Sequence, residues 1–313
     1  MEIRTLQSSP SILPLYARAA APMIPGASLL PGIPGGGKEI PELTLELPAV
    51  TAKAGDVAAY ARVCGFPLRD SLPVTYPHVL AFPLHMAVMA DGSFPFGAVG
   101  LVHVENRIVQ HRPVGVAEEL DLLVRPTPLQ PHRSGRTFSL VTEVRVEGEL
   151  VWESVSTMLR RGGGDKEAGG EREALDVPEE EFSASAEWRM GGGLGRRYAA
   201  VSGDRNPIHM HSLTAKPLGF PAAIAHGMWS KARALAALDG RLPDAFETDV
   251  RFRKPILLPA KVEFGSRDGA DGGIEFSVRD AKRHAPHLDG RVRPLEIKPK
   301  TTDKATKTGR KSK

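Results

Sequence analysis

The stretch YAAVSGDRNPIHMH, at residues 198–211, opens with a Tyr-Ala-x-Val-small-Gly pattern and continues into a polar loop. Within that loop Asp204, Asn206 and His209 lie close together, and the proline after Asn206 favours an extended backbone before it. Asp and Asn residues often form turns, so a plain turn is one interpretation. A carboxyl group and an imidazole on one stiff loop also suit acid/base chemistry in a single cavity. We prefer this second interpretation because a His-Gly pair follows at 226–227.

The opening pattern of this stretch occurs twice in the chain. YARVCG at 60–65 matches YAAVSG at 198–203, and YPHVLAFPLHMAVM at 76–89 can be laid over FPAAIAHGMWSKAR at 220–233. The offset grows from 138 residues at the first pair to 144 at the second, so the second half has six further residues, where the polar loop lies. Because the order of the landmarks is kept, we predict an internal duplication.

Alternating, β-rich segments follow each apolar stretch, beginning with AVGLVHVENRIVQHRPV in the first half and FETDVRFRKPILLPA in the second. Period-two alternation with short glycine turns after one long helix predicts an α+β unit with an antiparallel sheet in each half. The segment EVRVEGELVWES at 143–154 predicts a hairpin with its turn at 147–149.

Composition divides the chain into five segments. Residues 162–181, rich in glycine and acidic residues, are typical of a linker between a first half at 45–161 and a second half at 182–297. Residues 1–44 read as a loosely ordered arm rich in proline and glycine, and we expect residues 298–313 to be a disordered basic tail.

Most of the positive charge lies in this tail. The formal net charge is +4, and residues 298–313 carry +6, which leaves −2 on the other 297 residues. A near-neutral body argues against specific nucleic-acid binding, although weak contact between the tail and polyanions is an alternative.

The chain has no apolar run long enough to span a membrane, and its proline-rich start does not resemble a signal peptide. The single cysteine, Cys64, excludes an intrachain disulfide. It occupies the position of Ser202 in the repeat and reads as a small buried residue. We therefore expect a soluble, cytoplasmic protein.

Together these motifs resemble the MaoC-like hydratase family, the (R)-specific enoyl-thioester hydratases. The resemblance rests on YAAVSGDRNPIH, on IAHGM at 224–228 and on VRFRKPILLPA at 250–260. LPVTYPHVLAFPLHMAVM, GLVHVENRI and GELVWESVSTMLRR resemble the N-terminal halves of two-part dehydratases from actinobacteria. The resemblance covers about residues 45–297 and implies a double hotdog, in which two antiparallel sheets each wrap a long central helix and join into one wider sheet.

The resemblance also implies an activity, the reversible hydration of trans-2-enoyl thioesters to (R)-3-hydroxyacyl thioesters in fatty-acid metabolism. The carrier is coenzyme A or acyl carrier protein, and no cofactor is needed. Asp204 and His209 become the catalytic pair, with Asn206 orienting water or His209. The Gly227 amide donates to the thioester oxygen, from the position where we expect a helix to begin with free N–H groups.

The overlay predicts one active site per chain. Phe82 and Pro83 fall on the His-Gly pair of the second half, and proline has no N–H to donate. The first half also lacks the Asp-x-Asn-Pro-x-His segment, so we expect it to shape the acyl tunnel instead.

Eight further residues are candidates for substrate contact: Tyr198, Phe220, His226, Met228, Trp229, Arg251, Arg253 and Lys254. We expect the tyrosine to pack the loop and the histidine to cap the helix, with catalysis as its alternative role. The other aromatic residues and the methionine belong to the core or the tunnel wall. The three cations alternate along a strand, where exposure to solvent is the simpler expectation and contact with coenzyme A phosphates the alternative.

A metal site is a weaker interpretation. His209 and His211 form a His-x-His pair, but apart from Asp204 no third ligand is evident, so we predict none.

A non-catalytic acyl-thioester binding or scaffold protein is the second functional hypothesis, although a pure binder has no need of both an acid and a base. A nucleic-acid-associated protein is the third. Acyl chain length, carrier and direction of flux are left open by the sequence. So is the choice between monomer and homodimer.

Overall fold

The computed structural model describes residues 2–24, 26, 32–35, 37–163, 182–269 and 271–295. Nearly all of the predicted linker, and the whole of the basic tail, lie outside the described residues.

Strands and helices follow the duplicated order that the sequence predicts. The strands are β1 (Glu2–Thr5), β2 (Leu43–Thr51), β3 (Val102–Gln110), β4 (Glu119–Pro126), β5 (Gln130–His132), β6 (Gly135–Val146), β7 (Glu149–Arg161), β8 (Ala184–Met190), β9 (Phe246–Phe252), β10 (Ala260–Asp268), β11 (Ile274–Asp280) and β12 (Pro286–Pro294). The α-helices are α1 (Ile12–Ala20), α2 (Ala54–Cys64), α3 (Tyr76–Met89), α4 (Leu194–Ser202), α5 (Pro207–Met210), α6 (Ser212–Ala215) and α7 (Gly227–Ala237).

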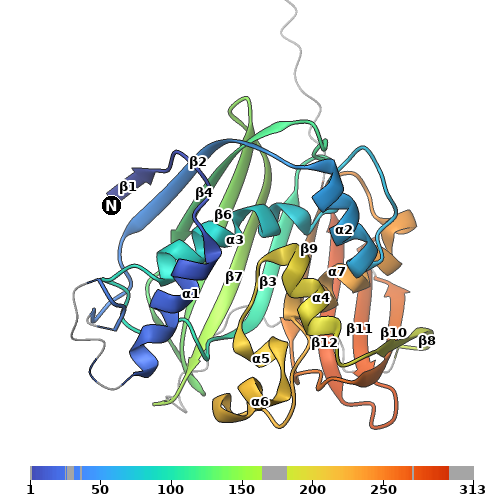
Figure 1. Cartoon of the computed structure of the whole chain (residues 1–313). Helices are drawn as coiled ribbons and strands as arrows, with labels where there is room; N and C mark the ends of the chain where they lie inside the picture. Colours follow the sequence, from blue (N-terminus) through green and yellow to red (C-terminus); the bar gives the residue numbers. More distant parts are fainter. Residues whose placement is uncertain are drawn as a thin grey trace, which may run out of the picture.

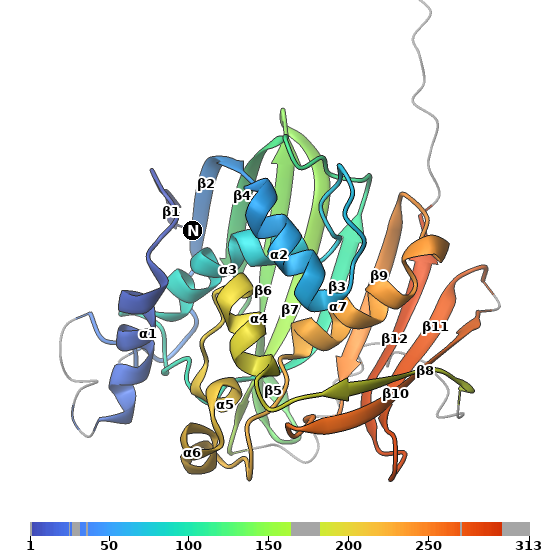
Figure 2. The ribbon, with the colours of Figure 1, turned by 45° about the vertical axis from the view of Figure 1, so that its right-hand side comes forward.

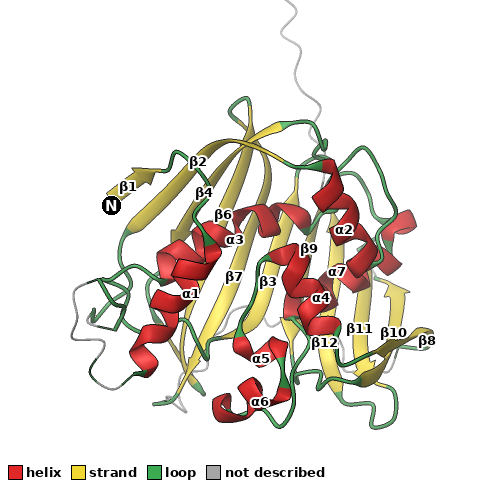
Figure 3. Ribbon diagram, viewed as in Figure 1, coloured by secondary structure: helices red, strands yellow, loops and turns green. Residues whose placement is uncertain are grey.

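All the strands belong to one curved sheet in the order β1-β2-β4-β6-β7-β3-β9-β12-β11-β10-β8, with β5 paired to β6. The pairs are antiparallel except for β1 and β2, which run parallel. The helices lie on one side of this sheet (Figures 1 and 3). The predicted hairpin is confirmed, because Val146 pairs with Glu149 and both Glu147 and Gly148 have positive φ.

The two halves meet where β3 pairs with β9, and each half contributes one central helix, α3 or α7, to the concave side (Figure 2). The expected fold class is therefore confirmed: this is the α+β double hotdog. The buried side chains of both helices form one continuous apolar core with the strands around them.

A buried lysine ties this junction together. Lys231, on α7, donates from Nζ to the backbone oxygen and the side-chain oxygen of Asn106 on β3, and to the backbone oxygen of Thr248 on β9. Three acceptors match the three N–H groups of an ammonium ion. The helix of one half thus holds strands from both.

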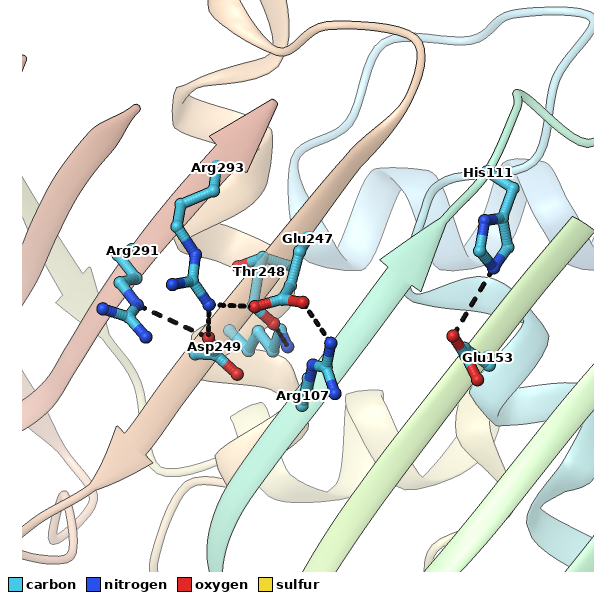
Figure 4. A network of polar contacts seen from close by, with 9 residues as sticks. Arg107, His111, Glu153, Glu247, Thr248, Asp249, Arg291 and Arg293 are labelled. Atoms are coloured by element: carbon cyan, nitrogen blue, oxygen red, sulfur yellow. Dashed lines mark hydrogen bonds and ion pairs between the residues drawn. The ribbon is translucent and has the colours of Figure 1, made fainter. Parts of the chain in front are cut away.

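An ion-pair network crosses the same junction (Figure 4). Glu247 on β9 pairs with Arg107 on β3 and with Arg293 on β12, and Asp249 lies 3.3 Å from Arg293 and 3.4 Å from Arg291. The arginines lower the pKa of Glu247 against the effect of burial, which raises it. The carboxylate therefore stays charged while it links three strands.

The register of the internal repeat differs from the overlay. Helices α2 and α4 both end at a left-handed glycine, Gly65 and Gly203, which is the last residue of the repeated motif. The next helix starts at Tyr76 in the first half and at Gly227 in the second. The overlay of Phe82 and Pro83 on the His-Gly pair is therefore wrong.

The physical reason is that residues 220–226 are not helical. Ile224 forms a β-bridge with Leu257, and the Ala225 N–H donates to the Ile256 oxygen. The polar loop consequently occupies 24 residues, 203–226, against 11 residues, 65–75, in the first half. In the first half, the Tyr76 N–H at the helix start already donates to the Pro73 oxygen.

The N-terminal segment is more ordered than we expected. Strand β1 pairs with β2, and helix α1 packs beside α3, as Figures 1 and 2 both show. Ile12 of α1 and Phe82 of α3 both approach Gly203, at the start of the polar loop. The arm therefore reaches the loop that holds the candidate residues.

Among the described residues, no helix has the length and apolar character needed to cross a membrane.

Candidate active site

The polar loop after α4 is built from two consecutive side-chain turns. The Asn206 N–H donates to Asp204 Oδ1 at 3.1 Å, and Asn206 Oδ1 accepts from the Ile208 N–H at 3.3 Å, which caps α5. The plain-turn interpretation of these residues is thus geometrically right, and it does not exclude a site. The two turns fix the direction of α5 and of the histidine that it carries.

His209 is buried on α5, and its tautomer follows from its contacts. Its Nδ1 lies 2.9 Å from the Ile224 oxygen, and because a carbonyl only accepts, Nδ1 carries the proton. Nε2 is therefore the nitrogen with the lone pair. Gly195 of α4 packs so closely against the His209 oxygen that a Cβ there would lie 1.9 Å from it.

His226 is the N-cap residue of α7, but its side chain makes no capping hydrogen bond, contrary to our expectation. Its Nε2 donates to the Asp204 backbone oxygen at 3.0 Å, and its ring stacks on that of His209 with centroids 3.7 Å apart. This imidazole therefore holds the loop in place.

Asp204, His209 and His226 converge: one ligand atom from each lies within 4.8 Å of the others. Burial raises the pKa of the Asp204 carboxyl, and the two imidazoles, the Asn206 N–H and a tyrosine hydroxyl lower it, with a net shift below the ordinary value. The site therefore holds a carboxylate at neutral pH.

The imidazoles are neutral at the same pH. Burial lowers the pKa of His209 despite the opposing effect of Asp204. Burial, with His209 as the next cause, lowers the pKa of His226 to about 3. The cluster thus offers three groups with free lone pairs, the Asp204 carboxylate, His209 Nε2 and His226 Nδ1, and the first two are the proton acceptors that we assign to the reaction.

Gly227 is the first residue of α7. Its N–H is one of those that have no acceptor within the helix, and it lies at the positive end of the helix dipole. A Cβ at this position would lie 3.1 Å from the ring of Phe252. Glycine therefore leaves room for a ligand atom to approach this N–H.

Tyr16, on α1, is a site residue that the sequence did not reveal. Its hydroxyl donates to Asp204 Oδ1 at 2.8 Å and accepts from the Arg205 N–H at 2.8 Å. The segment before residue 45 carried no motif, and a contact across 188 residues leaves no local pattern to find.

Asp204, Asn206, His209 and Gly227 all line one cavity of about 1540 Å³. Its wall extends into the first half, along α3, β3, β6 and β7. The predicted candidates that also line it are Tyr198, Phe220, His226, Met228, Arg251, Arg253 and Lys254. Trp229 is not part of this wall among the described residues, since its indole donates to the Val63 oxygen at 3.0 Å and packs in the core.

Of the three cationic residues that line the cavity, the two arginines pair with carboxylates and the lysine is exposed. Arg251 lies 3.3 Å from Glu105, its neighbour across the junction of the two halves, and Arg253 lies 3.0 Å from Asp289. Lys254 is exposed, and its backbone oxygen accepts from His287 Nδ1 at 2.9 Å. His287 also lines the cavity.

The spacing of Asp204, His209 and His226 would also admit a metal ion. Of the ring nitrogens, His209 Nδ1 and His226 Nε2 carry protons and point at carbonyl oxygens. The two remaining nitrogens and the carboxylate form the donor set. His211, the other member of the His-x-His pair, instead accepts from the Leu213 N–H.

Comparison with known proteins agrees with this geometry. Residues 176–270 match the model of the MaoC like domain. The chain is 38% identical over 293 residues to 3-hydroxyacyl-thioester dehydratase X of Mycobacterium tuberculosis, across 92% of this chain and all of that protein. The chain belongs to the MaoC-like family. The resemblance that the motifs indicated, to this family and to this relative, is therefore confirmed.

Solved structures of MaoC-like proteins share the fold. The crystal structure of HtdX from Mycobacterium tuberculosis has a TM-score of 0.72 at 38% identity and covers 80% of this chain and all of its own. A MaoC-like dehydratase from Phytophthora capsici has a TM-score of 0.69 at 20% identity and covers 82% of this chain and 97% of its own. At that identity the second match supports the fold alone.

Proposed function

We propose that this MaoC-like protein is a hydro-lyase that interconverts trans-2-enoyl thioesters and (R)-3-hydroxyacyl thioesters in fatty-acid metabolism. The observation that carries the proposal is the convergence of Asp204 and His209, within 4.8 Å, in a cavity that also contains the Gly227 N–H. The similarity to a 3-hydroxyacyl-thioester dehydratase supports the same reaction.

Asp204 and His209 would hold one water molecule between them. Both accept hydrogen bonds at neutral pH, and the only ring proton of His209 is engaged at Nδ1 with Ile224. The proton that reaches the α carbon must then come from the water whose oxygen attacks the β carbon, and it passes through the pair. Acid/base catalysis of this kind contributes about 10²–10⁴ in rate.

The Gly227 N–H would stabilise the negative charge that develops on the thioester oxygen. It stands at the start of α7, where the helix dipole favours negative charge. A single donor to an oxyanion is worth about 10²–10³ in kcat. The first half has no counterpart, because the Tyr76 N–H is already bonded and Pro77 has none. We therefore propose one active site per chain.

Three residues would position the pair without touching substrate atoms. Tyr16 and the Asn206 N–H hold the Asp204 carboxylate, and Asn206 also caps the helix that carries His209. His226 holds the Asp204 backbone through its Nε2. The loop is consequently fixed before substrate arrives, which is the condition for efficient acid/base catalysis.

Arg251, Arg253 and Lys254 would bind the carrier. These cations line the cavity close to Gly227, where a thioester must lie, and arginine suits phosphate groups. We therefore propose a coenzyme A or acyl carrier protein thioester as the substrate, with Tyr198, Phe220 and Met228 against the acyl group. Trp229 packs in the core, so we assign it no contact with the substrate. A cytoplasmic location and a homodimer remain predictions.

The first test is the loss of enoyl absorbance on mixing the protein with trans-2-butenoyl-CoA and with trans-2-decenoyl-CoA. We expect turnover to the (R)-3-hydroxy product, and a loss of about 10²-fold or more in Asp204→Asn and His209→Gln. Circular dichroism checks that both variants fold. Binding of thioesters without turnover, on either carrier, would support the non-catalytic hypothesis instead.

A further inference from the structure

Helix α3 turns one row of side chains toward the cavity. His78, Phe82, His85 and Met89 are spaced four, three and four residues apart and therefore share one face of the helix. All four line the same cavity as the catalytic loop. A pocket for a plain hydrocarbon chain is lined by apolar side chains. The two histidines in this row need a separate explanation.

A third histidine completes the cluster from the opposite element. His103, on β3, also lines the cavity, and its ring stacks on that of His78 with centroids 6.3 Å apart. The rings of His78 and His85 meet edge to face at 5.0 Å. Three imidazoles from two elements thus face one part of the cavity.

Two nitrogen atoms of this cluster have no protein partner. His85 Nε2 lies 2.7 Å from Thr142 Oγ1, so that imidazole is held by the protein. His78 Nδ1 and His103 Nε2 are buried and have no hydrogen-bond partner among the described residues, and His78 as a whole is only 7% exposed. Buried polar atoms are normally paired, so these two nitrogen atoms call for a partner that the described residues do not supply.

The neighbouring hydroxyl groups on the same wall are already engaged. Ser139 Oγ lies 3.1 Å from Thr157 Oγ1, and Ser156 Oγ accepts from Asn106 Nδ2 at 3.1 Å. His78 and His103 differ from these hydroxyl groups, because each keeps a buried nitrogen atom without a partner among the described residues.

The cluster carries no charge at neutral pH. Burial lowers the pKa of His78 to about 4 and that of His103 to about 3, and it lowers the pKa of His85 well below its ordinary value. A neutral imidazole offers one N–H and one lone pair. It matches a hydroxyl or carbonyl group, and it supplies no counter-charge for a carboxylate or an ammonium ion.

The cluster also lies close to the reacting end of the substrate. The ring of His103 packs against Phe252, with centroids 5.0 Å apart. Phe252 is in turn the side chain nearest to a Cβ placed on Gly227. A substrate whose thioester oxygen sits at Gly227 therefore lies close to these imidazoles.

We propose that His78, His85 and His103 form a subsite for an uncharged oxygen substituent, a hydroxyl or a carbonyl, on the acyl chain of the substrate. This inference rests on the proposed function and names its substrate class. The preferred substrates are oxygenated 2-enoyl thioesters, because an unsubstituted chain in the same place leaves His78 Nδ1 and His103 Nε2 unpaired.

The test compares kcat/KM for trans-2-decenoyl-CoA with kcat/KM for ten-carbon enoyl-CoAs that carry one hydroxyl group at C5 to C10 or one keto group at C5 to C9. We expect at least one oxygenated isomer to be preferred about 10-fold or more, since sites built to hydrogen-bond a substrate reject analogues that lack the group. The preference should disappear in His78→Phe and in His103→Phe. Turnover of trans-2-butenoyl-CoA, whose chain ends at C4, should stay within about 2-fold.

Two further variants separate hydrogen bonding from packing. His103→Gln keeps an amide that donates and accepts, so it should retain part of the preference. Met89→Leu changes the same face of α3 without changing polarity, so it should affect all ten-carbon substrates alike.

The outcomes distinguish the two proposals. Equal kcat/KM for all the ten-carbon thioesters overturns the subsite and leaves the proposed function standing. The subsite is also overturned if His78→Phe and His103→Phe lower kcat/KM for trans-2-butenoyl-CoA as much as for the ten-carbon thioesters. The histidines would then support the fold. A folded wild-type protein that turns over none of these acyl groups, on coenzyme A or on acyl carrier protein, overturns the proposed function and the subsite with it.

Discussion

The hydroxyl of Tyr16 donates a 2.8 Å hydrogen bond to Oδ1 of Asp204, a residue 188 positions further along the chain. The same hydroxyl accepts from the Arg205 N–H, so one side chain of α1 fixes both the carboxylate and the backbone of the polar loop. Tyr16 is not part of the cavity wall among the described residues. It therefore acts on the reaction through Asp204.

Replacing Tyr16 with Phe removes this bond with little change of shape. Because the hydroxyl helps to lower the pKa of Asp204, the acidic limb of the profile of kcat/KM against pH should move to higher pH. We also expect kcat to fall by about 10-fold with KM nearly unchanged, the effect of losing about 1.4 kcal/mol of positioning. Leu13→Ala, an exposed position on the same helix, is the control. An unshifted acidic limb would show that α1 serves stability alone.

Local chemistry made the polar loop predictable. The turns of Asp204 and Asn206 are closed by atoms two residues away, and Pro207 begins the helix that carries His209. The left-handed glycines that end α2 and α4 were equally visible as a repeated motif. In each case the groups that bond to one another lie within a few residues, so one short segment of sequence is enough to predict the turn or the helix end.

Contacts between distant segments were not predictable in this way. Tyr16 reaches its partner only after α1 packs beside α3, and His78 meets His103 only once the sheet wraps the helix. The overlay of the two halves failed for a related reason: residues 220–226 look like a helical entry, but their backbone bonds to the segment around Ile256. Tertiary pairing overrode the local pattern there.

Gly227→Pro tests the oxyanion donor directly. Proline removes the N–H, and it is well tolerated as the first residue of a helix after an extended residue, which His226 is, with φ −67° and ψ 137°. We expect kcat to fall by about 10²–10³ while Tm changes little. Gly227→Ala keeps the N–H and adds a Cβ 3.1 Å from the Phe252 ring, so it controls for crowding. Equal losses in the two variants would argue that space, and not the donor, matters.

Gly195→Ala should damage the site through the backbone. Its Cβ would lie 1.9 Å from the His209 oxygen, so either α4 or α5 must move. We expect kcat/KM to fall by at least about 10²-fold, as misplacement of a catalytic group by about 1 Å does. Gly240→Ala, where no atom lies within 4 Å of the added Cβ, should leave kcat/KM unchanged. A fully active Gly195→Ala protein would mean that His209 need not be held as it is here.

Stability should fall as the pH falls below about 6.5. Burial holds the pKa of His78 at about 4 and the pKa values of His103 and His226 at about 3, whereas the same histidines titrate near 6.5 in the unfolded chain. The unfolded state therefore binds more protons between these values, and these three histidines together lower the free energy of unfolding by up to about 4 kcal/mol per pH unit.

Urea unfolding at pH 7.5, 6.5 and 5.5 measures this slope. His78→Phe should reduce it by up to about 1.4 kcal/mol per pH unit, because one buried histidine no longer titrates. Replacing His284, whose side chain is 56% exposed, with Asn should leave the slope nearly unchanged. A free energy of unfolding that is flat across this range would mean that the buried imidazoles take up protons in the folded state.

Added zinc should inhibit the proposed reaction. The donor atoms of Asp204, His209 and His226 lie within 4.8 Å of one another, and an ion bound there would occupy the two acceptors that hold the attacking water. We expect micromolar Zn²⁺ to abolish turnover, EDTA to restore it, and dialysis against EDTA alone to leave the rate unchanged. His226→Asn, which removes one ligand and lies outside the proton-transfer pair, should weaken inhibition by about 10-fold or more. Loss of activity on EDTA treatment, restored by a metal ion, would contradict the acid/base assignment.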